Sequence, residues 1–210
     1  MYLLAHGSVD PRHAEDVGRI AHRLAAATRS PVRPCYLDHC GPDLASVADA
    51  PGTVVPLLFS PGYHARFDVA AAVAEAAVPL SVAQPPVLTD AAAWGRQLLA
   101  EGQGRRLPGQ AIWVTAGSRD PAVLRAWEET ASALDVRIAH ASGPGARLPS
   151  LAAGAGAVVL PLLVARGYFS DVIARQAAGS GLALAPLAGS SEALIAELAR
   201  LAATAPGAAA

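Results

Sequence analysis

Two histidines of this chain stand where imidazoles commonly take part in chemistry. His6 directly follows the apolar segment Tyr2–Ala5, and His64 closes the segment Val55–His64, which begins with apolar residues. If both segments contain neighbouring strands of a parallel sheet, both histidines lie at its carboxyl edge, where such sheets bind ligands. A neutral imidazole binds ions such as Fe²⁺, Co²⁺ and Zn²⁺, and its pKa of about 6.5 suits proton transfer. Two ligands are fewer than the roughly four of a structural metal site, so the pair predicts an ion that is passed on.

The chain contains an internal repeat whose second copy lacks both histidines. The segment Leu4–Pro11 reappears as Val114–Pro121, and Val55–His64 reappears in the same order as Leu160–Phe169. Ala116 and Phe169 replace the two histidines in the second copy, although the Gly-Ser-x-Asp-Pro that follows the first and the Gly-Tyr that precedes the second are kept. We therefore expect one active site, in the N-terminal half. The repeat predicts two lobes, 1–104 and 105–210, joined within the glycine- and proline-containing stretch 101–109.

Each copy has the local pattern of a strand followed by a helix. Apolar segments at 2–5, 53–59, 111–115 and 157–164 are typical of buried parallel strands. After the first strand of each copy, Asp-Pro supplies a helix N-cap and a proline in the first helical turn. Helices are predicted at 13–28, 67–77 and 171–178. The fold class is therefore α/β, with a small parallel sheet flanked by helices in each of two tandem lobes.

Composition and charge exclude several classes of function. The 210 residues include 16 basic residues, all of them arginine, against 17 acidic ones, for a net charge of −1. This balance argues against nucleic acid or an anionic membrane as a partner. Without lysine the chain has neither a Walker-type phosphate loop nor a Schiff-base nucleophile. No apolar stretch reaches the roughly 18 residues of a membrane span, and the N-terminus lacks a signal-peptide pattern, so we expect a cytoplasmic protein.

Other candidate motifs carry less information. Leu4–Gly7 resembles the Arg-His-Gly of the phosphohistidine phosphatases, but residue 5 is alanine rather than the phosphate-binding arginine. Gly-x-Ser-x-Gly, the nucleophile motif of α/β hydrolases, does not occur. Cys35, His39 and Cys40 match no standard zinc spacing, and the two cysteines are expected to be a reduced cytosolic pair. The remaining histidines are expected to be solvated: His13, His22 and His140.

The two motifs in this order resemble those of the sirohydrochlorin chelatases, which are class II, ATP-independent tetrapyrrole chelatases. The resemblance rests on His6-Gly7-Ser8-x-Asp10-Pro11-Arg12 and on the segment Val55–His64, and the longer bacterial members are also tandem duplications. It implies flavodoxin-like lobes and the insertion of a divalent ion into sirohydrochlorin, which yields sirohaem with Fe²⁺ or a cobalamin precursor with Co²⁺. It also implies that His6 and His64 are the catalytic, metal-binding pair. An acidic family position falls near Asp38, where glutamate is more usual.

The chemistry of metallation suggests further site residues. Metal insertion releases pyrrole N–H protons, which a nearby base must accept. Sirohydrochlorin is rich in carboxylates, and the planar guanidinium of arginine binds carboxylates through two hydrogen bonds. Aromatic side chains such as Tyr63 and Phe169 suit the face of the macrocycle. The expected substrate-binding residues are Ser8, Arg12, Asp38, Ser60, Tyr63, Arg66, Arg119 and Arg166.

These interpretations lead to one favoured function and two alternatives. The favoured function is a lyase-type chelatase that inserts Fe²⁺, or else Co²⁺ or Ni²⁺, without ATP or an organic cofactor. A non-catalytic carrier of a tetrapyrrole or metal is the first alternative, and a histidine-dependent phosphoesterase is the second. Because both lobes lie in one chain, a monomer is expected.

Overall fold

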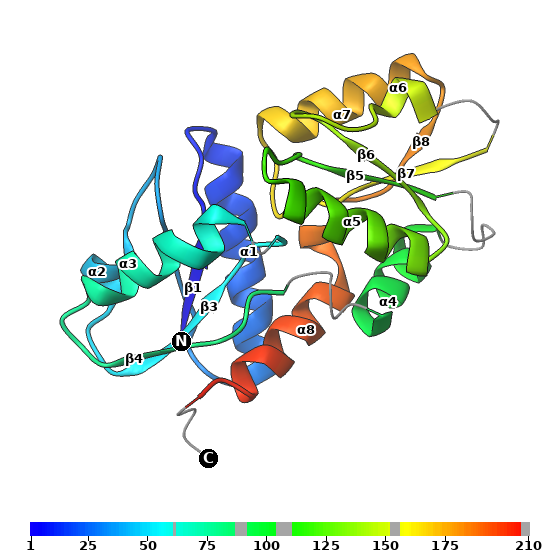
Figure 1. Ribbon diagram of the computed structural model, residues 1–210. Helices are drawn as coiled ribbons and strands as arrows, with labels where there is room; N and C mark the ends of the chain where they lie inside the picture. The colour runs from blue at the N-terminus through cyan, green and yellow to red at the C-terminus, as the bar shows by residue number, and fades with distance from the viewer. Residues whose placement is uncertain (61, 87–91, 104–110, 152–155, 207–210) are drawn as a thin grey trace. The chain divides into compact units, whose positions relative to one another are not determined.

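The computed structural model describes all residues except 61, 87–91, 104–110, 152–155 and 207–210 (Figure 1). Its residues form two compact units, Met1–Val87 with Leu194–Ala210 and Leu88–Ala193. These units are not the same stretches as the lobes expected from the repeat, because a terminal segment of the chain belongs to the first unit. Each unit contains one four-stranded parallel sheet.

The first sheet has the strand order β2-β1-β3-β4. Its strands are β1 (Tyr2–Ala5), β2 (Arg33–Tyr36), β3 (Gly52–Pro56) and β4 (Leu80–Val82). All pairs are parallel, with Leu4 of β1 opposite Cys35 of β2 and Pro56 of β3. The chain leaves β1 toward β2 on one side and later adds β3 on the other. This reversal of strand order is the switch point at which open parallel sheets bind ligands.

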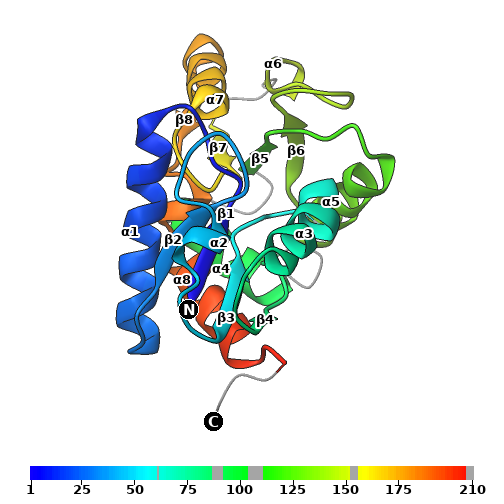
Figure 2. The ribbon, with the colours of Figure 1, turned by 90° about the vertical axis from the view of Figure 1, so that its left-hand side faces the viewer.

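Helices cover both faces of the first sheet (Figures 1 and 2). Successive strand residues point to opposite faces, so Tyr2 and Leu4 face the core beneath α2 (Leu44–Val47) and α3 (Val69–Ala74). The opposite face carries α1 (Pro11–Thr28), whose apolar stripe Val17, Ile20, Ala21 and Leu24 is buried. Asp10 caps α1 by accepting a hydrogen bond from the backbone N–H of Arg12. The Asp-Pro pattern thus marks the start of this helix as predicted.

The second sheet repeats this topology with the order β6-β5-β7-β8. Its strands are β5 (Ala111–Thr115), β6 (Arg137–His140), β7 (Val158–Pro161) and β8 (Ala183–Leu184). The short α6 (Leu148–Leu151) and α7 (Tyr168–Gly179) contribute buried residues to one core, which includes Ile112, Val159 and Ile173. On the other face lie α4 (Ala92–Gln103) and α5 (Pro121–Ala133), as Figure 1 shows. Asp120 caps α5 as Asp10 caps α1, so the repeated sequence produces repeated structure.

The last helix, α8 (Glu192–Ala203), lies mostly in the first unit. From Leu194 onward it belongs with the first sheet and lies on the side that α1 covers (Figure 1). Leu194 and Leu198 are fully buried. A short 3-10 turn, η3 (Ala188–Ser190), precedes α8 within the second unit.

The α/β class with two tandem parallel sheets is confirmed, and most predicted elements differ only at their ends. The segment expected as a helix at 67–77 instead begins as a π-helical turn, η1 (His64–Asp68), and continues as α3. The polar stretch expected to join the lobes falls partly in α4, and its remainder, 104–110, lies outside the described residues. None of the helices in the described ranges combines the length and apolarity that a membrane crossing requires.

Candidate metal-handling site

Three histidines stand on loops that leave neighbouring strands at the carboxyl edge of the first sheet. His6 follows β1, His39 follows β2, and His64 begins η1 beyond β3. Because β1 is the central strand of the three, its loop lies between the other two. The backbone N–H groups of Leu37 and Asp38 donate to the carbonyls of Ala5 and His6, so the first two loops run side by side beyond the strands. The sheet therefore brings together residues that are distant in sequence.

Gly7 permits the close approach of these two loops. Its φ is +98°, and a Cβ atom there would fall 1.8 Å from the backbone oxygen of Asp38. Every other residue type would clash at this point and would also adopt the left-handed region unfavourably. The equivalent Gly117 has φ +100° and a Cβ there would fall 2.0 Å from the oxygen of Ser142. The glycine in the repeated Gly-Ser motif is thus required by the backbone in both copies.

The rings of His6 and His64 are in direct contact. Their centroids lie 4.2 Å apart with an interplanar angle of 84°, an edge-to-face arrangement. His64 is about half-exposed, with 52% of its side chain accessible, whereas His6 is half-buried. The predicted pairing of these two histidines is therefore present in the structure.

Both rings have Nδ1 next to an oxygen atom. His64 Nδ1 lies 2.5 Å from Oδ2 of Asp68, one helical turn further along. A carboxylate only accepts hydrogen bonds, so His64 carries its proton on Nδ1 and presents the lone pair of Nε2. His6 Nδ1 lies 3.3 Å from the carbonyl oxygen of Gly7, which imposes the same tautomer. Metal-binding histidines are typically held in this way.

The pKa of His6 is lowered from its ordinary value. Burial is the largest cause, the hydrogen bond to Gly7 opposes it, and the nearby His64 and His39 lower the pKa further. Burial also lowers the pKa of His13, with a smaller contribution from His6. His13 is half-buried in the first turn of α1, and its Nδ1 is buried without a hydrogen-bond partner in the described structure, so the expectation of a solvated residue is wrong. Both shifts favour neutral imidazoles, the form that binds a metal or accepts a proton.

Exposed aromatic rings stand beside His64 on the same π-helical turn. Tyr63 is 66% exposed and Phe67 is 53% exposed, and their ring centroids lie 4.9 Å apart. The Arg66 guanidinium lies over the Phe67 ring, 5.5 Å from its centroid. Tyr63 and Arg66 were predicted from the sequence, whereas Phe67 was not. Two large exposed apolar rings next to paired imidazoles offer a flat surface to a planar ligand.

The other predicted residues of the first unit differ in their surroundings. Ser8 accepts a hydrogen bond from the backbone N–H of Asp10 and so stabilises the turn before α1. Arg12 makes an ion pair with Asp10, at 2.6 Å between Nη2 and Oδ2. Asp38 accepts a hydrogen bond from the backbone N–H of His39 and stands next to the imidazole pair. Ser60 is half-buried in the loop after β3.

The second unit has the same loops with different side chains. Ala116 and Phe169 occupy the two histidine positions, and Phe169 packs against the core of that unit. Arg119 is exposed and Arg166 is half-buried, each on a loop that leaves the second sheet. His140, expected to be solvated, is instead only 2% exposed, and its Nδ1 lies 2.8 Å from Oγ1 of Thr115. His140 is the last residue of β6 and pairs with Thr115 of the neighbouring strand β5, which explains this burial.

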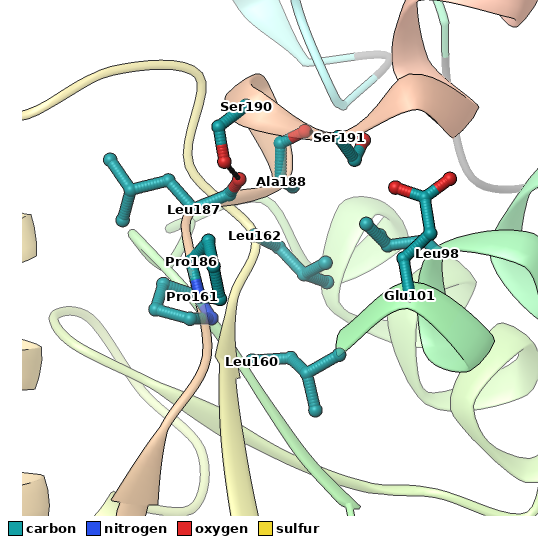
Figure 3. Close-up of a pocket in the computed structure, with 10 residues that line it drawn as sticks. All are labelled: Leu98, Glu101, Leu160, Pro161, Leu162, Pro186, Leu187, Ala188, Ser190 and Ser191. Atoms are coloured by element: carbon teal, nitrogen blue, oxygen red, sulfur yellow. Dashed lines mark hydrogen bonds between the residues drawn. The ribbon is translucent and has the colours of Figure 1, made fainter. Parts of the chain in front are cut away.

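A cavity of about 150 Å³ lies in the second unit (Figure 3). Its wall is mainly apolar and is formed by Leu98, Glu101, Leu160, Pro161, Leu162, Pro186, Leu187, Ala188, Ser190 and Ser191. The Glu101 carboxylate accepts hydrogen bonds from the backbone N–H groups of Glu192 and Ala193, the first two residues of α8. Ligand sites usually measure about 300 Å³ or more, so this cavity is too small for a tetrapyrrole.

The cysteines are unpaired with each other, as expected for a reduced pair. Cys35 is buried in β2, and this burial raises its pKa to about 12, so its thiol is inert. Within the described residues, no group of three or more His, Cys, Asp or Glu side chains is arranged to hold a metal ion. The arrangement in the first unit is therefore an open pair of imidazoles rather than a closed metal site.

His39 also lies beside the histidine pair, although the sequence pattern groups it only with the two cysteines. Its ring centroid lies 5.4 Å from that of His6. A usable signal was present: His39 follows the strand that pairs with β1, and loops at the carboxyl ends of adjacent parallel strands meet.

Comparisons with known proteins give a sequence-family match and three similar folds. The sequence model of the CbiX family matches residues 1–90, whereas the comparison with curated proteins finds no match. The solved structure of SirB from Bacillus subtilis with Fe³⁺ has a TM-score of 0.77 at 17% identity, over 95% of this chain and 92% of that one. The sirohydrochlorin chelatase SirB from Bacillus subtilis subspecies spizizenii, in complex with cobalt, gives 0.75 at 17% identity, over 96% and 92%.

A third structure extends the likeness to a larger protein. DR2241 from Deinococcus radiodurans, described as a multi-domain protein with structural similarity to chelatases, gives 0.65 at 21% identity. The match covers 96% of this chain and 54% of that one. The N-terminal 90 residues thus match the model of the CbiX family, and the whole chain has the fold of the sirohydrochlorin chelatase SirB.

Proposed function

We propose that this chain is a sirohydrochlorin chelatase, which inserts a divalent metal ion into the tetrapyrrole. The contact between His6 and His64 carries the proposal, because two imidazoles, each with an oxygen beside its Nδ1 atom, meet at the carboxyl edge of the first sheet. The family match covers both histidines, and relatives of the same fold are described with Fe³⁺ and with cobalt. The metal ion is a substrate here, so an open pair of ligands suits it better than a closed cage.

The reaction exchanges one divalent ion for two pyrrole protons. The ion leaves water for the imidazole Nε2 atoms, and the four nitrogens of the macrocycle then replace the imidazoles. The two N–H protons pass to a base and on to water, so charge balances and no electron is transferred. A histidine that has just released the ion regains the lone pair that accepts such a proton. The step requires neither ATP nor an organic cofactor.

The substrate face is proposed to be the aromatic surface beside His64. Tyr63 and Phe67 offer stacking area, and Arg66 supplies a positive charge suited to a carboxylate of sirohydrochlorin. We further propose that the substrate is bound by residues on the loops at the strand ends. These residues are Ser8, Arg12, Asp38, Ser60, Arg119 and Arg166. We propose Fe²⁺ as the physiological ion, with Co²⁺ and Ni²⁺ as competitors, and a monomer in the cytoplasm as the working form.

The decisive experiment is anaerobic metallation of sirohydrochlorin, followed by absorbance, with Fe²⁺, Co²⁺ and Ni²⁺ in parallel. We expect multiple turnovers from the wild type and a loss of about 10²-fold in His6→Ala and His64→Ala. His22→Ala is the matched control, because His22 is exposed on α1 away from the strand ends. Tight pigment binding without acceleration over the uncatalysed rate would overturn the proposal and identify a carrier instead.

A further inference from the structure

We propose that His39 is a third imidazole ligand, through which the chain takes up its metal ion before the ion reaches His6 and His64. The inference rests on the proposed function for its purpose and on the geometry of three loops for its residues. His39 lies in the loop after β2, with its ring centroid 5.4 Å from that of His6, while the ring centroids of His6 and His64 lie 4.2 Å apart. Half of the His39 side chain is exposed, at 49%.

These separations suit ligands of one ion. An imidazole nitrogen binds a borderline ion at about 2.0–2.1 Å, which places the ring centre about 3 Å from the metal. Two such rings at a tetrahedral angle have centres about 5 Å apart. The observed 4.2 and 5.4 Å fall on either side of this value. The three nitrogens do not converge in the described structure, so His39 must rotate toward the pair, as an exposed side chain on a loop is able to do.

The surroundings of His39 resemble those of the other two rings. Asp38 Oδ1 lies 3.7 Å from His39 Nδ1, beyond hydrogen-bond distance but close enough for a small ring movement to bring the two atoms together. Nδ1 therefore stands beside an oxygen in all three rings: Asp38 for His39, Gly7 for His6 and Asp68 for His64. The Nε2 atoms of the three rings have no hydrogen-bond partner among the described residues. Carboxylate or carbonyl support at one nitrogen and a free lone pair at the other is the arrangement that metal-binding histidines require.

The backbone holds His39 in an unusual conformation. Its φ is +65°, in the left-handed region that histidine adopts less readily than glycine or asparagine. The backbone N–H of His39 donates to the Asp38 carboxylate at 2.6 Å, and the N–H of Cys40 donates to the Asp38 carbonyl at 2.8 Å. These contacts fix the turn that carries the ring. Because half of the His39 side chain is exposed, an ion that arrives from solvent can reach it.

The test uses the full-length chain and Zn²⁺ alone, without tetrapyrrole. In long-range ¹H–¹⁵N spectra of the histidine rings, we expect the Nε2 resonances of His6, His39 and His64 to shift together on Zn²⁺ addition. A shift confined to His6 and His64 would overturn the inference, as would the absence of any shift. The ring resonances of His22 serve as the internal reference and are expected not to shift.

Affinity for Co²⁺ provides a second measurement. His39→Asn removes the imidazole but suits the left-handed backbone, so the fold is retained. We expect Co²⁺ affinity to fall about 10-fold or more, with no change in His22→Ala. Unchanged affinity in His39→Asn would overturn the inference even if the wild type metallates sirohydrochlorin. Conversely, three shifted rings in a chain that never metallates the pigment would support the three-imidazole site and overturn the proposed function.

Discussion

Gly7 and Asp38 approach so closely that a Cβ atom on Gly7 would lie 1.8 Å from the Asp38 backbone oxygen. Gly7 connects His6 to the turn before α1, and Asp38 precedes His39. This backbone contact therefore holds the loops that carry His6 and His39 side by side. Gly18, in the middle of α1, has nothing within 4 Å of the corresponding position and serves as a contrast.

The first prediction follows from this contact. Gly7→Ala introduces both the clash and a left-handed alanine, so we expect a loss of about 2 kcal/mol or more in the free energy of unfolding. Urea denaturation measures it. Gly18→Ala is the matched control and is expected to be neutral or to stabilise the helix by up to about 1 kcal/mol. Equal stability of the two variants would show that the loops are free to separate.

The second prediction concerns the carboxylate that supports His64. Asp68→Asn replaces an obligate acceptor by a group that also donates, so His64 is no longer restricted to the tautomer with a free Nε2. We expect Co²⁺ affinity to fall by about 10–100-fold, measured by titration of the apoprotein. The control is Glu75→Gln at the exposed end of α3, which also removes one negative charge. Wild-type affinity in Asp68→Asn would mean that another group orients the ring.

The third prediction tests the aromatic surface. Phe67→Ala removes one ring of the Tyr63–Phe67 pair without touching either paired histidine of the site. Since an aromatic contact contributes about 0.5–1.5 kcal/mol beyond its area, we expect the dissociation constant for sirohydrochlorin to rise about 3- to 10-fold. Fluorescence quenching measures it. Leu184→Ala alters an exposed apolar side chain of β8 and is expected to leave binding unchanged; equal affinities for the two variants would exclude stacking on Phe67.

The fourth prediction concerns the helix that ends the chain. Glu101 accepts hydrogen bonds from the N–H groups of Glu192 and Ala193, at 2.9 and 2.8 Å. Glu101→Ala leaves both donors at the α8 N-terminus without this acceptor, so we expect a loss of about 1 kcal/mol. Thermal unfolding compares it with Glu129→Ala, an exposed residue of α5. If the two variants unfold at the same temperature, the hydrogen bonds of Glu101 do not contribute to the stability of the folded chain.

The fifth prediction concerns pH and His140. Burial is the main cause of its lowered pKa, with Arg147 lowering it further and Glu128 opposing. The unfolded chain therefore binds a proton more readily than the folded chain below about pH 6.5. The contribution of His140 to stability is complete above that pH and is lost as the pH falls toward the folded value. Burial shifts the pKa of His6 and His13 in the same direction.

Urea midpoints at pH 8, 6.5 and 5 measure this dependence. We expect the wild-type midpoint to fall with pH, and the fall to be smaller in His140→Asn, which has no titrating ring. His22→Ala is expected to retain the wild-type slope. Parallel curves for the wild type and His140→Asn would contradict the assignment of this pH dependence to His140.

Local sequence patterns were sufficient to predict the two central strands of each sheet, several helices and the duplication. Buried strands are short apolar segments, and Asp10-Pro11 and Asp120-Pro121 begin helices through interactions with the next two or three residues. The pairing of His6 with His64 was also predictable, because parallel strands place their carboxyl ends on one edge. These features depend on periodicity, on caps and on a general rule of sheet topology.

The positions of His39, Phe67 and His140 depended on the tertiary structure. His39 reaches the site through a left-handed residue and a loop held by Gly7, and Phe67 and Asp68 face their partners through a π-helical turn. His140 is buried because its strand lies beside β5 and Thr115 supplies its hydrogen bond. The sequence determines which strands form and where their loops emerge, since those choices are local. The final position of each loop side chain depends on contacts between segments far apart in the chain. These contacts form only when the tertiary structure is packed.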